Sequence, residues 1–149
     1  MNISYILEEK RKKYIPENSR TEEKLPVLLG VQAGGPETVE YPLEWEKVDD
    51  EMAHSGIHSI YKIRGDSMEP RFCDGDRVIV KKEDEYRTGD IVLVSVGGAL
   101  TIKKLKKTPA GMELIPLNWK YNVQRYKQND LEFKNAQIIG RVTELRGNV

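Results

Sequence analysis

Short runs rich in β-branched and apolar residues, separated by turn-forming residues, recur through the chain from residue 58 onward. Runs of this length are typical of strands, and the glycine and proline residues between them favour tight connections. Their spacing predicts a mostly β fold, either a compact, mostly antiparallel sheet or a partly open barrel. We expect the strands at residues 58–63, 77–81, 90–96, 100–105, 112–115 and 138–145.

The N-terminal part of the chain lacks this strand pattern. Residues 3–14 can form a short amphipathic helix, which Pro16 ends, and the charged residues that follow have no apolar period. Such an arm is too short for a helix-turn-helix domain, which needs several packed helices. We therefore expect an N-terminal arm and linker, helical or disordered, then an extended segment with a cleavage site, then one folded domain, at residues 1–24, 25–36 and 37–149.

Composition narrows the class of protein. Lys plus Arg and Asp plus Glu both total 24, so net charge gives no case for nucleic acid or an acidic membrane as the main partner. The single cysteine, Cys73, excludes an internal disulfide framework and fits a reducing compartment. No apolar run is long enough to cross a bilayer, and the first residues do not form a secretory signal. We expect a cytoplasmic protein with no membrane partner and no direct binding to DNA.

Residues Gly65-Asp66-Ser67-Met68 form the most distinctive local motif. Gly65 permits a tight turn that exposes the serine side chain. The backbone N–H groups of that turn, around Gly65, Asp66 and Met68, can form an oxyanion hole. In isolation, Gly-Asp-Ser usually means only a turn. It is not the nucleophile elbow of the α/β-hydrolases, because Glu69 replaces the second glycine of that motif.

A lysine on a later strand can supply the base for this serine. A lysine that burial keeps neutral can take the proton of a serine hydroxyl, so the pair can hydrolyse an amide without histidine. Side chains alternate along a strand, which places Lys103 and Lys104 on opposite faces of residues 100–105. Both faces carry apolar residues, so alternation does not choose between the two lysines. Thr101 shares a face with Lys103 and can hold its amine by a hydrogen bond, which favours Lys103.

Taken together, these residues resemble the LexA and UmuD family of self-cleaving serine peptidases. The resemblance covers roughly residue 25 to the C-terminus, and it assigns the nucleophile to Ser67. The family's Thr-x-Lys pattern falls on Thr101 and Lys103. Ala33-Gly34 looks like the family's self-cleavage site, with one departure from its pattern, which is that Gly35-Pro36 follows directly.

The resemblance implies a serine endopeptidase that cuts its own Ala33-Gly34 bond when RecA–single-stranded-DNA filaments form. The residues before Ala33 are too few for the DNA-binding domain of a LexA-type repressor. The arrangement therefore resembles the UmuD type, in which removal of a short arm activates a subunit of a translesion DNA polymerase. Two alternatives stay open. The chain can be the C-terminal peptidase and dimerisation domain of a LexA-like or phage CI-like repressor, or an inactive dimerisation module.

Two further expectations concern metals and oligomeric state. We expect no cofactor and no metal site, because His54 and His58 lack the adjacent glutamate of the metalloprotease pattern. We expect a homodimer through the folded domain, as in the family. The predicted strand at residues 138–145 carries apolar residues near the end of a small domain, where an exposed edge would invite pairing with a second copy.

Overall fold

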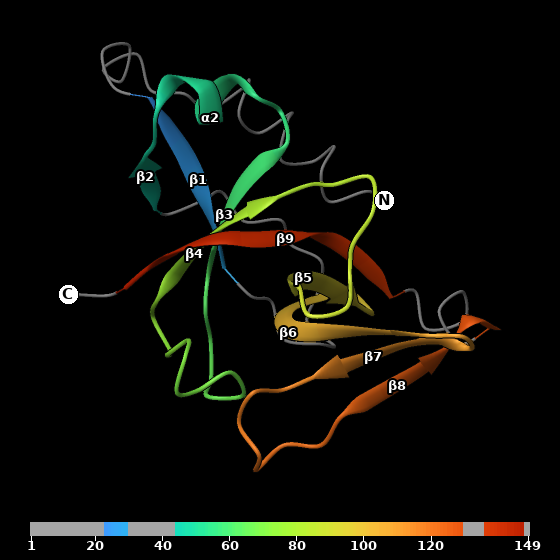
Figure 1. The fold of residues 1–149 in the computed structure, drawn as a ribbon. Coiled ribbons are helices and arrows are strands. Elements are labelled where there is room, and N and C mark those ends of the chain that lie inside the picture. Colours follow the sequence, from blue (N-terminus) through green and yellow to red (C-terminus); the bar gives the residue numbers. More distant parts are fainter. Residues whose placement is uncertain (1–22, 30–43, 130–135, 148–149) are drawn as a thin grey trace.

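The computed structural model describes residues 23–29, 44–129 and 136–147. Within these residues the chain forms one nine-stranded sheet with the strand order β2-β1-β3-β4-β9-β5-β6-β7-β8 and one short helix, α2 (Figure 1). All neighbouring strands are antiparallel except β1 and β3. The predicted mostly β, largely antiparallel fold is therefore confirmed. The elements are β1 (Lys24–Leu29), β2 (Trp45–Lys47), α2 (Asp50–His54), β3 (His58–Lys62), β4 (Arg77–Lys81), β5 (Ile91–Val96), β6 (Ala99–Thr108), β7 (Gly111–Ile115), β8 (Gln124–Lys127) and β9 (Gln137–Arg146).

The apolar pattern finds every strand of the sheet's centre but misses β2 and β8, which lie at its two edges. An edge strand has a neighbour on one side only, and one of its faces can stay in solvent. A single buried side chain can then be its only contact with the core. In β8, which reads Gln-Arg-Tyr-Lys, only Tyr126 is buried. Such a segment carries no alternation that a sequence pattern can detect.

The predicted strand at residues 138–145 is present as β9. These residues belong to β9, which lies between β4 and β5 and is hydrogen-bonded to both. Figure 1 shows β9 crossing the middle of the molecule. Ile139 is buried, whereas Leu145 is 43% exposed on the half of β9 that pairs with β4 alone. The exposed apolar edge expected for this strand therefore stays a prediction.

The sheet curls, so that strands distant from one another in its order share one core. The Tyr61 hydroxyl of β3 donates a hydrogen bond to the Leu100 carbonyl of β6 at 3.2 Å, although β4, β9 and β5 separate these two strands. The loop that follows β3 is thereby held near β6. The buried residues of this inner cluster are Tyr61, Ile63, Met68, Phe72, Val78, Val80, Ile91, Leu93, Ile102 and Ile139.

β1 and α2 cover the opposite face of β3 and β4. Leu25 and Val27 of β1 are 0% and 2% exposed and pack with Ile60 and Ile79. Met52 and Ala53 of α2 pack against the same cluster. The described part of the extended segment expected from residue 25 is therefore present as β1.

The predicted helix at residues 3–14 lies outside the described residues. Within the described ranges, no helix is long and apolar enough to cross a membrane.

Candidate active site

The turn that carries Ser67 lies in the loop between β3 and β4. Gly65 has a φ of +80°, a conformation that side-chain-bearing residues rarely adopt, and its N–H donates to Asp74 Oδ1 at 2.7 Å. Beyond the serine, the side chains of Met68 and Phe72 are 1% and 2% exposed and enter the inner cluster. The turn is thus fixed on both sides of Ser67, by a hydrogen bond before it and by apolar burial after it.

Lys103 of β6 reaches the serine from the other side of the site. Its side chain is buried, and its Nζ lies 3.0 Å from Ser67 Oγ. Nζ also lies 2.7 Å from Thr101 Oγ1 and 3.1 Å from the Ile102 carbonyl oxygen. Lys104 is exposed, as alternation on the strand requires. The structure therefore brings together Ser67, Thr101 and Lys103, and it leaves Lys104 in solvent.

Burial lowers the pKa of Lys103 to about 8, because the low-dielectric interior disfavours the charged ammonium. The three contacts of Nζ suit the neutral amine, which has two N–H donors and one lone pair. The donors can serve Thr101 Oγ1 and the Ile102 carbonyl, and the lone pair then accepts the hydrogen of the Ser67 hydroxyl. This is the arrangement that a general base needs before it takes a proton.

The backbone around Ser67 leaves donors available for a developing negative charge. The Glu69 N–H donates to the Asp66 carbonyl at 3.1 Å, and the Phe72 N–H donates to the Met68 carbonyl at 3.0 Å. Among the described residues, the N–H groups of Ser67 and Met68 have no acceptor. Two unpaired N–H groups beside a nucleophile are what an oxyanion hole requires.

Asn118, in the loop after β7, holds the Ser67 turn and was not predicted from the sequence. Its backbone N–H donates to the Ser67 carbonyl at 2.9 Å, and its Nδ2 donates to the Asp66 carbonyl at 3.0 Å. The Tyr121 hydroxyl donates to the Asp66 carboxylate. An asparagine in a loop is usually only a turn residue, so the sequence around it gives no signal of this contact.

The predicted cleavage site, Ala33-Gly34, lies outside the described residues. Leu29 is the last residue of β1 and pairs with Lys62, at the end of β3. On the other side of the gap, the Glu44 carboxylate accepts a hydrogen bond from Lys62 Nζ at 3.0 Å. The described residues on both sides of the gap, Leu29 and Glu44, therefore lie beside Lys62.

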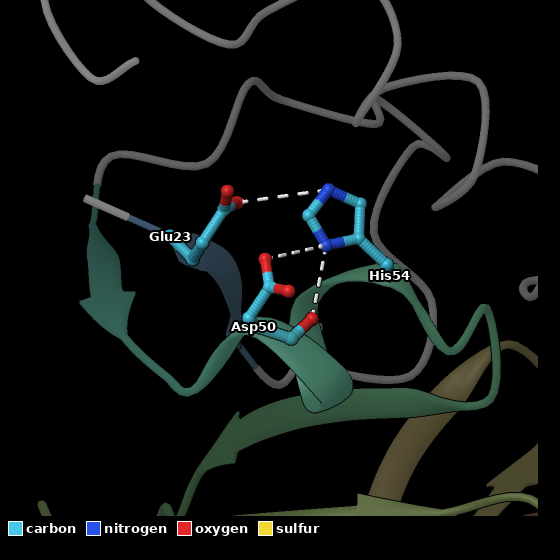
Figure 2. A group of neighbouring side chains, drawn as sticks. All are labelled: Glu23, Asp50 and His54. Atoms are coloured by element: carbon cyan, nitrogen blue, oxygen red, sulfur yellow. Dashed lines mark hydrogen bonds and ion pairs between the residues drawn. The ribbon is translucent and has the colours of Figure 1, made fainter. Parts of the chain in front are cut away.

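A second group of charged side chains lies at the start of β1, at the end of the sheet opposite to the Ser67 turn. Figure 2 shows Glu23, Asp50 and His54 pointing toward one another. Hydrogen bonding to the Asp50 carbonyl, followed by the charges of Glu23 and Asp50, raises the pKa of His54. The atoms of Glu23, Asp50 and His54 that could bind a metal ion lie within 4.8 Å of one another. All three are at least partly exposed, and the nearest distances from the His54 ring nitrogens to the Glu23 and Asp50 carboxylates are 3.9 Å and 3.1 Å.

Comparison with known proteins places this chain in a family. The sequence model of the family described as Peptidase S24-like matches residues 26–143. The LexA repressor of Thermotoga petrophila is 33% identical over 122 residues, which cover 80% of this chain and 59% of the relative. The LexA repressor of Thermotoga maritima is 31% identical with the same coverage. That of a Nocardioides species is 32% identical over 126 residues, which cover 80% of this chain and 46% of the relative.

The chain spans less than two thirds of the length of these relatives, at 59% and 46%. The family match, in contrast, covers most of the chain and includes both the serine turn and β6. The chain belongs to the Peptidase S24-like family of serine peptidases, which cleave themselves with a serine and a lysine.

Proposed function

We propose that this protein is an autopeptidase in which Ser67 is the nucleophile and Lys103 the general base, and that it cuts its own Ala33-Gly34 bond. The observation that carries the proposal is the 3.0 Å contact between Ser67 Oγ and a buried lysine whose pKa is lowered to about 8. A serine hydroxyl is a weak nucleophile alone and becomes effective when a neutral base accepts its proton.

The reaction follows from these contacts. Lys103 takes the Ser67 proton while Oγ attacks the carbonyl carbon of Ala33. The N–H groups of Ser67 and Met68 stabilise the oxyanion that forms. Lys103, now an ammonium held by Thr101 and the Ile102 carbonyl, gives its proton to the leaving amine of Gly34. A water molecule, activated by the same lysine, then hydrolyses the ester on Ser67. Neither a metal ion nor a cofactor takes part in these steps.

The topology of the sheet supports cleavage within one chain. β1 and β3 are parallel neighbours, so their C-terminal ends lie at the same end of the sheet. The turn that carries Ser67 follows the end of β3, and the segment that holds Ala33-Gly34 follows the end of β1. Ala33 is four residues beyond Leu29, and four extended residues span up to roughly 14 Å. The segment with the Ala33-Gly34 bond and the turn with Ser67 thus follow the ends of two neighbouring strands.

Purified full-length protein is expected to cleave itself slowly between Ala33 and Gly34. Mass spectrometry of samples aged at pH 9 should reveal the two fragments that this cut defines, with a faster appearance when RecA–single-stranded-DNA filaments are added. A cut at another bond would show that the cleavage site is wrongly assigned. A folded chain that stays intact for days under both conditions would instead support the inactive dimerisation module.

We propose two roles for the cleaved product. In the first, as in UmuD, the product is an accessory subunit of a translesion DNA polymerase. In the second, the peptidase domain ends repression, a role that the LexA repressors among its relatives favour. The genes beside this one distinguish the roles, because an adjacent polymerase gene supports the first and an adjacent operator-controlled or phage gene supports the second.

The family resemblance also supports a homodimer through the peptidase domain, with residues 1–24 dispensable. The contact that we propose for this dimer is the end of β9 that pairs with β4 alone, where Leu145 is 43% exposed. Light scattering at tens of micromolar is expected to give the mass of a dimer for the full chain and for a chain that lacks residues 1–24. A monomer in both would contradict the proposal. A dimer lost only on truncation would place the interface in the removed residues.

A further inference from the structure

The loop after β7 controls the geometry of the site although it supplies no reacting atom. We propose that Asn118, assisted by Tyr121, is a positioning residue that aims the two N–H donors of the oxyanion hole. The proposal rests on the proposed role of Ser67 as nucleophile.

The argument begins with two peptide planes. The Asp66 carbonyl and the Ser67 N–H belong to one peptide unit, and the Ser67 carbonyl and the Met68 N–H belong to the next. In a planar trans peptide the C=O and N–H groups point in opposite directions. A group that holds both carbonyls therefore fixes the direction of both N–H groups.

Asn118 holds both carbonyls at once. Its Nδ2 donates to the Asp66 carbonyl at 3.0 Å and its backbone N–H donates to the Ser67 carbonyl at 2.9 Å. The opposite ends of the same planes are the N–H groups of Ser67 and Met68, which have no acceptor among the described residues. The hydrogen bonds of Asn118 thus set the direction of the donors that the oxyanion needs.

Asn118 is itself held rigidly. Its side chain is 8% exposed, its Oδ1 accepts from the Lys120 N–H at 3.1 Å, and its carbonyl accepts from the Tyr121 N–H at 3.1 Å. Its neighbour Leu117 packs against the inner cluster. Each polar atom of Asn118 thus has a hydrogen-bond partner, which favours a single orientation of the residue. Through its bonds to the two carbonyls, that orientation fixes the serine turn.

Tyr121 adds a second hold on the same turn. Its hydroxyl donates to the carboxylate of Asp66, which is the residue whose carbonyl Asn118 also holds. Tyr121 is half exposed, so its loss leaves the core intact. It therefore offers a milder way to loosen the turn than a change at Asn118.

The test is the pH profile of self-cleavage in the full chain. Asn118→Ala removes the Nδ2 bond to the Asp66 carbonyl and keeps the backbone bond to the Ser67 carbonyl. It is expected to lower the rate at the high-pH plateau roughly tenfold to a hundredfold, because a misdirected Ser67 N–H no longer stabilises the transition state. The midpoint of the profile should stay where it is in the unaltered chain, because the contacts of Lys103 are unchanged. Tyr121→Phe is expected to lower the plateau several-fold, again with the midpoint unmoved.

Met112→Ala is the matched control. Met112 lies on β7, the strand before the Asn118 loop, and it is buried in a different cluster from the serine turn. This change should lower the melting temperature and leave the plateau rate of the folded protein unaltered. A plateau lost equally in Met112→Ala and Asn118→Ala would mean that Asn118 acts only through stability, and it would overturn the proposal.

A folded Asn118→Ala chain that cleaves at the unaltered plateau rate would also overturn the proposal. If Asn118→Ala does not fold, Tyr121→Phe decides, and an unaltered rate in that variant overturns it. These outcomes differ from failure of the proposed function, which would appear as an unaltered chain that never cleaves or as a Ser67→Ala chain that still does.

Discussion

Replacing Ser67 or Lys103 is expected to abolish self-cleavage while the chain stays folded. Without Ser67 there is no Oγ to form the ester, and without the amine 3.0 Å away the serine keeps its proton. Loss of either member of such a pair lowers a rate by roughly a thousandfold or more. Ser67→Ala and Lys103→Met are the suitable changes, because methionine fills the buried site of the lysine without a charge. Fragment yield measured by mass spectrometry, together with circular dichroism, gives the result.

Lys104→Ala is the control for this experiment. Lys104 is next to Lys103 in sequence, but its side chain is exposed on the opposite face of β6. The variant should cleave at the rate of the unaltered chain. The opposite result, an inert Lys104→Ala and an active Lys103→Met, would show that the base is wrongly assigned.

The rate of self-cleavage is expected to rise with pH and to level off above about pH 8, where Lys103 loses its proton. Only the neutral amine can act as a base, and burial has moved the pKa of this group down from its ordinary value near 10.5. Below the midpoint the neutral fraction falls tenfold for each pH unit. Between pH 6 and pH 9 the rate should therefore change by roughly a hundredfold. Initial rates over this range give the profile, and a flat or falling curve would contradict it.

A change at Thr101 identifies the group that titrates. The Thr101 hydroxyl lies 2.7 Å from Lys103 Nζ, and hydrogen bonds to a charged group are stronger than those to a neutral one. Thr101→Val removes a partner that favours the ammonium, so the midpoint should move to lower pH. A midpoint that stays in place would assign the titration to a group other than Lys103.

The choice between Lys103 and Lys104 shows where the strand pattern stops being informative. Alternation separates the two side chains, but it does not say which face of the strand is buried. In the structure β6 has apolar contacts on both faces, because Ile102 belongs to the inner cluster and Leu105 to the cluster around β7. The resemblance to a family favoured Lys103, and the buried environment of its amine agrees with that choice.

Contacts between segments far apart in the chain could not be predicted from the sequence. Asn118 meets Asp66 across 52 positions, and this contact depends on how the sheet curls. The central place of β9 was equally hidden, because its apolar residues suit an edge or a centre. One local signal was available at Gly140. A Cβ there would lie 2.5 Å from Val80 Cγ1, so glycine permits the close approach of β4 and β9.

β1 precedes the Ala33-Gly34 bond in the chain. Both strands with which it pairs, β2 and β3, follow that bond. Cutting the bond removes none of the pairing of β1 with β2 and β3, and it uncovers neither Leu25 nor Val27. Two such buried side chains contribute roughly 3–6 kcal/mol. The nicked protein should therefore keep its N-terminal fragment as a noncovalent strand. Peptide hydrolysis and fragment departure become separate events, and a protease assay that reports only the cut would not reveal when the fragment leaves.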